Sequence, residues 1–122
     1  MVKLFVFLIR KKGITRQEFS RYWQNEHAEV VLRTFPEMKR YVQNHAIELS
    51  GQRDPPFDGI AESWFDDLES LRRAMDDYTN NKGKELREDE EKFLDRSRMP
   101  FFVCQERLIK AQKVNQWRGD YD

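Results

Sequence analysis

The stretch VKLFVFLI, residues 2–9, decides the fold of this chain. Apart from Lys3 its residues are aliphatic or aromatic, and apolar side chains stand on both faces of the alternating pattern. One face carries Val2, Leu4, Val6 and Leu8, and the other carries Phe5, Phe7 and Ile9. A strand that is apolar on both faces normally lies in the middle of a sheet, with other material packed above and below it. We therefore expect a central strand that is covered on both sides.

A helix is predicted directly after this strand and the turn at Gly13. Thr15 and Glu18 have the spacing of a capping box, and Ile14 and Phe19 have the spacing of a hydrophobic staple. At 100° per residue the inward stripe contains Phe19, Trp23, Glu26 and Val30, with Tyr22 on one flank and His27 and Val31 on the other. The helix is expected to end at about residue 33, before Pro36.

The rest of the chain contains three more predicted strands and a second helical region. Strands are predicted over residues 38–47, 59–65 and 101–109, and the proline-containing stretch 48–58 is predicted to be a loop. Residues 68–93 are helical in composition, with a break near residues 79–83, and the dense mixed charges of residues 82–98 indicate a solvated face. Residues 110–122 lack a clear period, so we expect an arm or a tail there.

The predicted order β-α-β-β-α-β is typical of the ferredoxin-like α+β topology. In that topology a four-stranded antiparallel sheet carries both helices on one face. The length of 122 residues allows one domain, over residues 1–109, followed by the 110–122 arm. Because the second face of the first strand is also apolar, we expect a second copy of the chain to cover it. The result would be a homodimer joined through its sheet faces, a dimeric α+β barrel.

Composition argues against several classes of partner. Twenty-two basic residues balance twenty-two acidic ones, so no net positive field favours a nucleic acid or an anionic membrane. The longest apolar run, residues 4–9, is far shorter than the roughly 20 residues that span a bilayer. No signal-peptide pattern is recognised at the N-terminus, and Cys104 is the only cysteine, which is typical of a reducing, cytoplasmic setting.

His27 is the most informative ionisable residue, because an ordinary pKa of about 6.5 suits a group that takes and returns a proton. The alternative is a structural histidine whose ring bonds a backbone carbonyl. Tyr41, Gln43 and His45 form a polar stripe on one face of the second strand, which faces either the helices or solvent. Ser63 and Cys104 are small polar groups at mid-strand positions.

Motifs for metals, cofactors and nucleophilic triads are not recognised. The two histidines lie eighteen residues apart and there is one cysteine, so no metal-ligand spacing occurs. The chain has no glycine-rich phosphate loop and no Gly-x-Ser-x-Gly elbow. The second helical region holds no histidine that could bind a haem iron. We therefore predict neither a metal nor a cofactor.

Several linked segments resemble the EthD family of small dimeric α+β barrel proteins. They are ITRQEFSRYWQNEHAE (14–29), RYVQNH (40–45), DGIAESWFDD (58–67) and FLDRSRMPFFVCQE (93–106). The resemblance implies a ferredoxin-like protomer, a homodimer joined through its sheets, and a pocket between the sheet and the helices of each subunit. Relatives include accessory components of ether degradation and cofactor-free enzymes acting on lactones and polyketides.

The methylmuconolactone methylisomerase type of relative is the most useful for assigning residues. Its first-helix histidine corresponds to His27, and its second-strand tyrosine corresponds to Tyr41. Where that type has a third-strand cysteine, this sequence has Ser63. Since Tyr41 would then face the helices, strand alternation places Gln43 and His45 on the pocket side as well.

Together these features predict a cofactor-independent lyase or isomerase of the decarboxylase, dehydratase or cyclase type. Its substrate would be a small hydrophobic carbonyl compound such as a lactone, an aromatic acid or a polyketide. His27 would act as the base and Tyr41 would bind the enolate oxygen, while Trp23, Gln43, His45 and Ser63 would bind or orient the substrate. The alternatives are a non-catalytic accessory protein that binds a small molecule for an oxidative degradation system, and a cofactor-free oxygenase.

Overall fold

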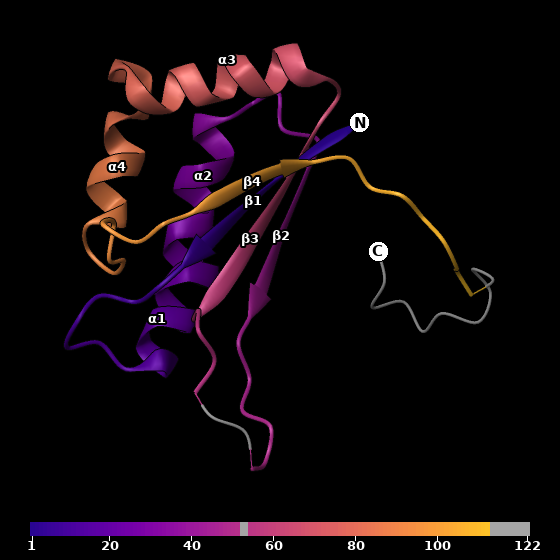
Figure 1. Cartoon of the computed structure of the whole chain (residues 1–122). Helices are drawn as coiled ribbons and strands as arrows, with labels where there is room; N and C mark the ends of the chain where they lie inside the picture. Colours follow the sequence, from indigo (N-terminus) through magenta and orange to yellow (C-terminus); the bar gives the residue numbers. More distant parts are fainter. Residues whose placement is uncertain (52–53, 113–122) are drawn as a thin grey trace.

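The computed structural model describes residues 1–51 and 54–112. Within this part of the chain, four strands form one antiparallel sheet in the order β2-β3-β1-β4 (Figure 1). The strands are β1 (Val2–Leu8), β2 (Arg40–His45), β3 (Gly59–Phe65) and β4 (Phe101–Cys104). The sheet therefore confirms that residues 2–8 form a central strand, with β3 on one side and β4 on the other.

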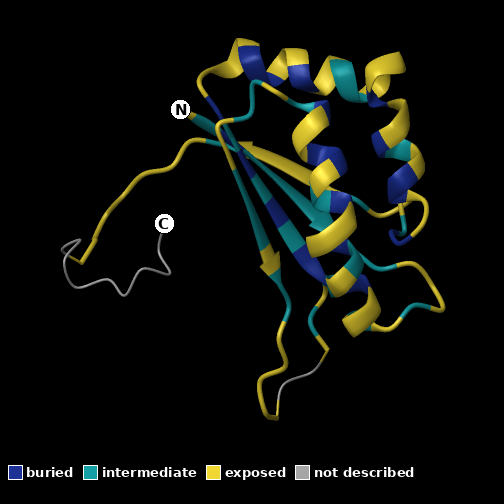
Figure 2. Ribbon diagram, turned by 180° about the vertical axis from the view of Figure 1, so that it is seen from behind, coloured by how far each residue is buried: buried dark blue, intermediate teal, exposed yellow. Residues whose placement is uncertain are grey.

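The helices cover one face of this sheet (Figure 2). The first helical region consists of α1 (Arg16–Tyr22), a π-helical turn η1 (Trp23–His27) and α2 (Ala28–Thr34). The second consists of α3 (Leu68–Thr79), a short 3₁₀ turn η2 (Asn81–Gly83) and α4 (Lys84–Glu90). The predicted ferredoxin-like α+β architecture is confirmed, including the break between α3 and α4.

The start of α1 has the predicted capping box. The Thr15 hydroxyl accepts a hydrogen bond from the Glu18 backbone N–H at 3.0 Å, and the Glu18 carboxylate accepts one from the Thr15 N–H at 2.9 Å. Both bonds satisfy backbone donors that the first helical turn would leave unpaired. Phe19 is fully buried, and Ile14 packs against the same apolar cluster, so the start of the helix is fixed on the sheet.

The π-helical turn η1 changes which side chains face inward. The Ala28 N–H donates to the Trp23 carbonyl five residues earlier, so this turn is wider than an α-helical turn. His27 is buried in consequence, while Glu26 is exposed. The prediction that Glu26 faces the core was wrong, because it assumed a constant 100° per residue through a segment that is wound more loosely.

Trp23 connects the first helical region to the sheet. Its side chain is fully buried in a cluster with Phe19, Phe93 and Leu8, and its six-membered ring lies directly on Gly59 at the start of β3. A Cβ atom at position 59 would overlap that ring. The absence of a side chain at Gly59 therefore permits the close approach of helix and sheet.

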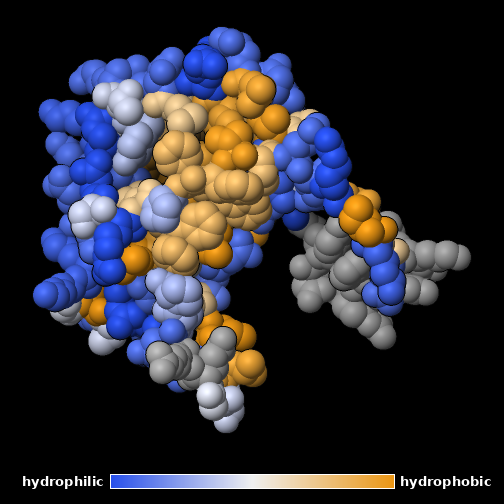
Figure 3. Space-filling model, in the orientation of Figure 1, coloured by the Kyte–Doolittle hydropathy of each residue, from blue (hydrophilic) through white to orange (hydrophobic). Residues whose placement is uncertain are grey.

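The opposite face of the sheet is not covered by any element among the described residues. It carries Lys3, whose ammonium pairs with Glu62 and Glu106, each at 2.7 Å, and lies 4.3 Å from the ring of Trp64. Phe102 on β4 shares this face and is 57% exposed. Figure 3, which looks onto this side, shows apolar side chains gathered over the strands with hydrophilic ones around them.

Three strands are shorter than predicted, although β1 differs by one residue only, ending at Leu8 rather than at Ile9. β4 ends at Cys104 rather than at residue 109, because Cys104 pairs with Lys3 and the partner strand begins only one residue earlier. β2 covers residues 40–45 rather than 38–47, which is the length over which it pairs with β3. Residues 105–112 are exposed and have no regular structure, and residues 113–122 of the predicted arm lie outside the described residues. Among the described residues no helix is long and apolar enough to span a membrane.

Replacing Gly59 by alanine should destabilise the fold, because the new Cβ must displace the Trp23 ring. Overpacking of this kind costs about 1–3 kcal/mol, measurable as a lower urea midpoint. Trp23→Phe removes the ring atoms that would clash, so the double variant should be more stable than the sum of the two single effects predicts. Additive effects would contradict this explanation.

Candidate functional site

A cavity of about 410 Å³ lies between the sheet and the helices. Its walls are mostly apolar, with β1 contributing Leu4, Val6 and Leu8 and β3 contributing Ala61 and Phe65. A small set of polar side chains also lines it: His27, Tyr41, Ser63, Tyr78, Thr79, Glu90 and Arg96. An apolar enclosure with a few polar groups is typical of a small-molecule site.

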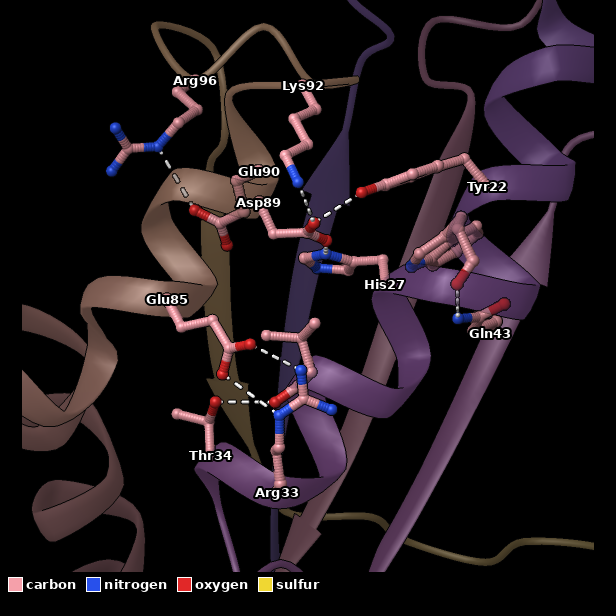
Figure 4. A network of polar contacts seen from close by, with 12 residues as sticks. Tyr22, His27, Arg33, Thr34, Gln43, Glu85, Asp89, Glu90, Lys92 and Arg96 are labelled. Carbon is pink, nitrogen blue, oxygen red and sulfur yellow. Dashed lines mark hydrogen bonds and ion pairs between the residues drawn. The ribbon is translucent and has the colours of Figure 1, made fainter.

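His27 is held in this cavity by a carboxylate from the second helical region. Its Nδ1 lies 2.6 Å from Oδ2 of Asp89, at the end of α4, and both side chains are buried (Figure 4). The Tyr22 hydroxyl donates to Oδ1 of Asp89 at 2.5 Å, and the Lys92 ammonium lies 3.5 Å from the same oxygen. Asp89 thus joins three elements and fixes the orientation of the imidazole ring.

The surroundings of His27 determine which of its nitrogens can act as a base. An ionised carboxylate only accepts hydrogen bonds, so Nδ1 carries the proton that is shared with Asp89. In the neutral ring Nε2 then has a free lone pair, and no hydrogen bond to Nε2 is found within residues 1–51 and 54–112. This is the arrangement that a carboxylate gives to a histidine general base.

The pKa values of the pair favour this state near neutral pH. Burial lowers the pKa of His27 below its ordinary value of 6.5, although the hydrogen bond and charge of Asp89 act against the shift. For Asp89, burial alone would raise the pKa, but the hydrogen bonds from Tyr22 and His27 bring it below the ordinary 3.8. A neutral imidazole therefore faces an ionised carboxylate.

Tyr41, Ser63 and Trp23 also border the cavity, as the sequence analysis placed them on its side of the fold. Tyr41 on β2 and Ser63 on β3 are direct cross-strand partners, so their side chains emerge at the same level. Burial raises the pKa of Tyr41 above its ordinary value of 10, so the phenol remains protonated and can donate a hydrogen bond.

Gln43 and His45 share the helix-facing side of β2 with Tyr41, but they do not line the cavity. The Gln43 amide donates to the Trp23 carbonyl at 2.9 Å and to the Tyr41 hydroxyl at 3.3 Å. His45 Nε2 lies 2.9 Å from Gln43 Oε1, and its ring packs on Trp23 with centroids 4.4 Å apart. These two side chains thus contact the outer side of Trp23, whereas His27, Tyr41, Trp23 and Ser63 come together around one space.

Four residues of the site were not predicted from the sequence: Asp89, Glu90, Tyr78 and Arg96. The charges of residues 82–98 had indicated a solvated face, yet Asp89 and Glu90 are each only 6% exposed. A signal was available, because these acids stand three and four residues after Leu86, an apolar residue of the same predicted helical region that is buried in the structure. A carboxylate at a core-facing position of a helix calls for a partner, and here the partners come from other elements.

In the part of the chain that the structure describes, no group of three or more histidine, cysteine, aspartate or glutamate side chains is positioned to hold a metal ion.

Most of the chain matches the model of a known protein family. The model of the EthD domain matches residues 11–97, which is more than two thirds of the chain. A search of curated proteins found no significant match. Among solved structures, an ethyl tert-butyl ether D (EthD) family protein from Bacillus halodurans is 24% identical, with a TM-score of 0.66 over 88% of this chain and 99% of that one.

Two further solved structures show the same fold at lower identity. A dimeric protein of unknown function with a ferredoxin-like fold from Bacteroides fragilis is 11% identical, with a TM-score of 0.59 over 86% of this chain and 95% of that one. SnoaB, a cofactor-independent oxygenase from Streptomyces nogalater, is 13% identical, with a TM-score of 0.59 over 91% of this chain and 97% of that one.

The state of His27 can be measured without a substrate. Nitrogen-15 NMR should show a protonated Nδ1 and an unprotonated Nε2 at pH 7, with a pKa below 6.5. Asp89→Asn should lower that pKa further, because the variant removes the carboxylate that favours the protonated ring. The chain has two histidines, so the imidazole signals that remain in the His45→Gln variant are those of His27. An unchanged or higher pKa in Asp89→Asn would contradict the pairing.

Proposed function

Since the chain belongs to the EthD domain family, we propose that it is a cofactor-independent lyase or isomerase acting on a small hydrophobic carbonyl compound. The observation that carries this proposal is the His27–Asp89 pair, whose free Nε2 belongs to a side chain lining an apolar cavity. A neutral, oriented imidazole in a poorly hydrated site is suited to removing a proton from carbon. A lactone, an aromatic acid or a polyketide fragment would match the apolar walls.

In this proposal Nε2 of His27 removes the proton next to the substrate carbonyl, and the electron pair of that C–H bond forms an enolate. Tyr41 donates a hydrogen bond to the enolate oxygen, where negative charge develops. Return of the proton to a different carbon gives an isomer, and loss of a neighbouring group gives the product of a lyase. Trp23 and Ser63 would contact the substrate directly, and Gln43 and His45 would act on it through Trp23.

A second candidate function is a cofactor-free oxygenase, which the similarity to SnoaB favours. There His27 would deprotonate a quinol-like substrate so that the resulting anion reacts with oxygen. Oxygen uptake with 1,4-naphthalenediol above its rate of autoxidation would favour this function. Saturable ligand binding without any turnover would instead favour the accessory role, in which the protein holds a small molecule for another enzyme.

Removal of His27 provides the direct test of the base. We expect the chain to catalyse exchange of the C2 protons of 1-tetralone for deuterium, and His27→Ala to slow it by about 10²–10⁴-fold. Asp89→Asn should slow it by at least about tenfold, because the proton on Nδ1 is no longer held by a charge. Mass spectrometry measures the exchange.

Asn25→Ala provides the matched control for this experiment. Asn25 is an exposed residue of the same π-helical turn, so its truncation should leave exchange unchanged. If a folded His27→Ala variant loses less than about tenfold, His27 is not the general base.

We also propose that the protein forms a homodimer through the uncovered face of its sheet. The apolar side chains gathered there and the dimeric neighbour from Bacteroides fragilis support this arrangement. A second copy would bury Phe102, which a monomer leaves largely exposed.

Phe102→Glu should convert this dimer to a monomer, because the interface would then have to bury an unpaired carboxylate. Leu32→Glu is the matched control, since Leu32 is 54% exposed on α2, on the helix side of the fold. Light scattering after gel filtration measures both masses. A monomeric wild type, or a dimeric Phe102→Glu variant, would exclude this interface.

A further inference from the structure

Glu90 is a second ionisable group in the cavity that contains His27. It is the last residue of α4, follows Asp89 directly, and is only 6% exposed. In Figure 4 its carboxylate points towards Arg96, whereas that of Asp89 points towards His27. Asp89 and Glu90, although consecutive in the sequence, therefore bind two different sets of partners.

Within the described part of the chain, the hydrogen bonds of the Glu90 carboxylate all go to one of its two oxygens. The Tyr78 hydroxyl donates to Oε1 at 2.5 Å, and Nε of Arg96 donates to the same oxygen at 3.2 Å. Oε2 has no hydrogen-bond partner among the described residues, and among them only Glu37 Oε1 is both sealed from solvent and unpartnered. Oε2 thus keeps accessible surface, and the space that Glu90 lines is the cavity.

The surroundings of Glu90 favour a protonated carboxyl more than those of an ordinary glutamate. Burial, together with the charge of Asp89, raises the pKa of Glu90 above 4.5, although the contacts with Tyr78 and Arg96 act in the opposite direction. Burial and the neighbouring Glu90 raise the pKa of Tyr78 to about 12, so its phenol remains a donor. Tyr78 and Arg96 therefore fix the carboxyl while its second oxygen stays free.

We propose that Glu90 is the general acid of this site and that the substrate is a β-hydroxy carbonyl compound, from which the enzyme removes water. The inference rests on the proposed role of His27 as the base. His27 Nε2 takes the proton next to the carbonyl, which gives the enolate. The electron pair of the enolate then forms the new C=C bond as the C–O bond of the hydroxyl breaks. The Glu90 carboxyl donates its proton to the departing oxygen, which leaves as water. The proton on His27 then returns to Glu90 through solvent.

Dehydration uses both His27 and Glu90, whereas isomerisation does not need Glu90. A single base can remove a proton and return it at another carbon. A hydroxyl group, however, leaves poorly as hydroxide in an apolar cavity, so its departure requires a proton donor. A cavity that places a base and an acid in different environments fits the loss of water.

The test uses a probe that reports the two steps separately. Loss of water from 3-hydroxy-1-tetralone gives 1-naphthol, which fluoresces, while exchange of its C2 protons in deuterium oxide reports proton removal alone. We expect Glu90→Gln to slow naphthol formation by about 10²–10⁴-fold and to leave C2 exchange within about twofold of wild type. His27→Ala should abolish both reactions.

The control and a second variant keep the result interpretable. Glu85→Gln makes the same change on the exposed side of α4, where Glu85 pairs with Arg33, and should alter neither reaction. Glu90→Asp keeps a carboxylic acid and should form naphthol faster than Glu90→Gln does. Retained C2 exchange also demonstrates that the variants of Glu85 and Glu90 are folded.

The possible failures can be told apart. Wild-type protein that exchanges the C2 protons but forms no naphthol, or a Glu90→Gln variant that forms naphthol normally, would overturn the role of Glu90 and leave His27 as the base. A Glu90→Asp variant no faster than Glu90→Gln would also contradict it. Wild-type protein that gives neither reaction would count against the proposed function itself.

Discussion

The position of Trp23 on Gly59 is the contact on which the site depends. The fully buried indole ring sets how closely the first helical region approaches the sheet, and the Trp23 carbonyl accepts hydrogen bonds from both Ala28 and Gln43. The bond from Ala28 belongs to the π-helical turn that brings His27 inward, and the bond from the Gln43 side chain connects this turn to β2. A turn of ordinary α-helical width would rotate His27 relative to the core, so the packing of one aromatic ring determines where the imidazole stands.

The polar groups of the cavity are stabilised by one another. Asp89 and Glu90 are buried, and each accepts hydrogen bonds from a tyrosine and a basic or imidazole side chain. Removing one partner from a buried pair leaves an uncompensated charge, which is strongly destabilising. For this reason, tests of these residues use asparagine and glutamine, which keep the shape of the side chain and an oxygen that can accept a hydrogen bond.

The sequence predicted the parts of the molecule that depend on local pattern. The apolar alternation of residues 2–9, the capping box at Thr15 and the strand 59–65 are all confirmed, and so is the EthD resemblance. The burial of His27 in place of Glu26 could not be predicted, because a π-helical turn arises from packing rather than from spacing. The shorter β4 depends on where its partner strand ends, which is tertiary information. Asp89 lies in the charged stretch 82–98, which is typical of a solvated face. Its position three residues after the buried Leu86 distinguishes it from the exposed acids of that stretch.

The end of α4 shows why these acids indicate function. The C-terminal end of a helix carries partial negative charge, so two consecutive carboxylates in the last turn are locally unfavourable. Lys92 and Arg96 offset this charge from the segment that follows, and Tyr22, His27 and Tyr78 supply hydrogen bonds from other elements. The last turn of α4 contains one basic residue, Arg87. A helix selected only for stability would also direct its acids to solvent. A helix end that goes against this local preference, and is compensated by several other elements, is expected at a functional site. Here the two residues that do so are Asp89 and Glu90. Glu90 lines the cavity, and Asp89 is bonded to His27, which lines it too.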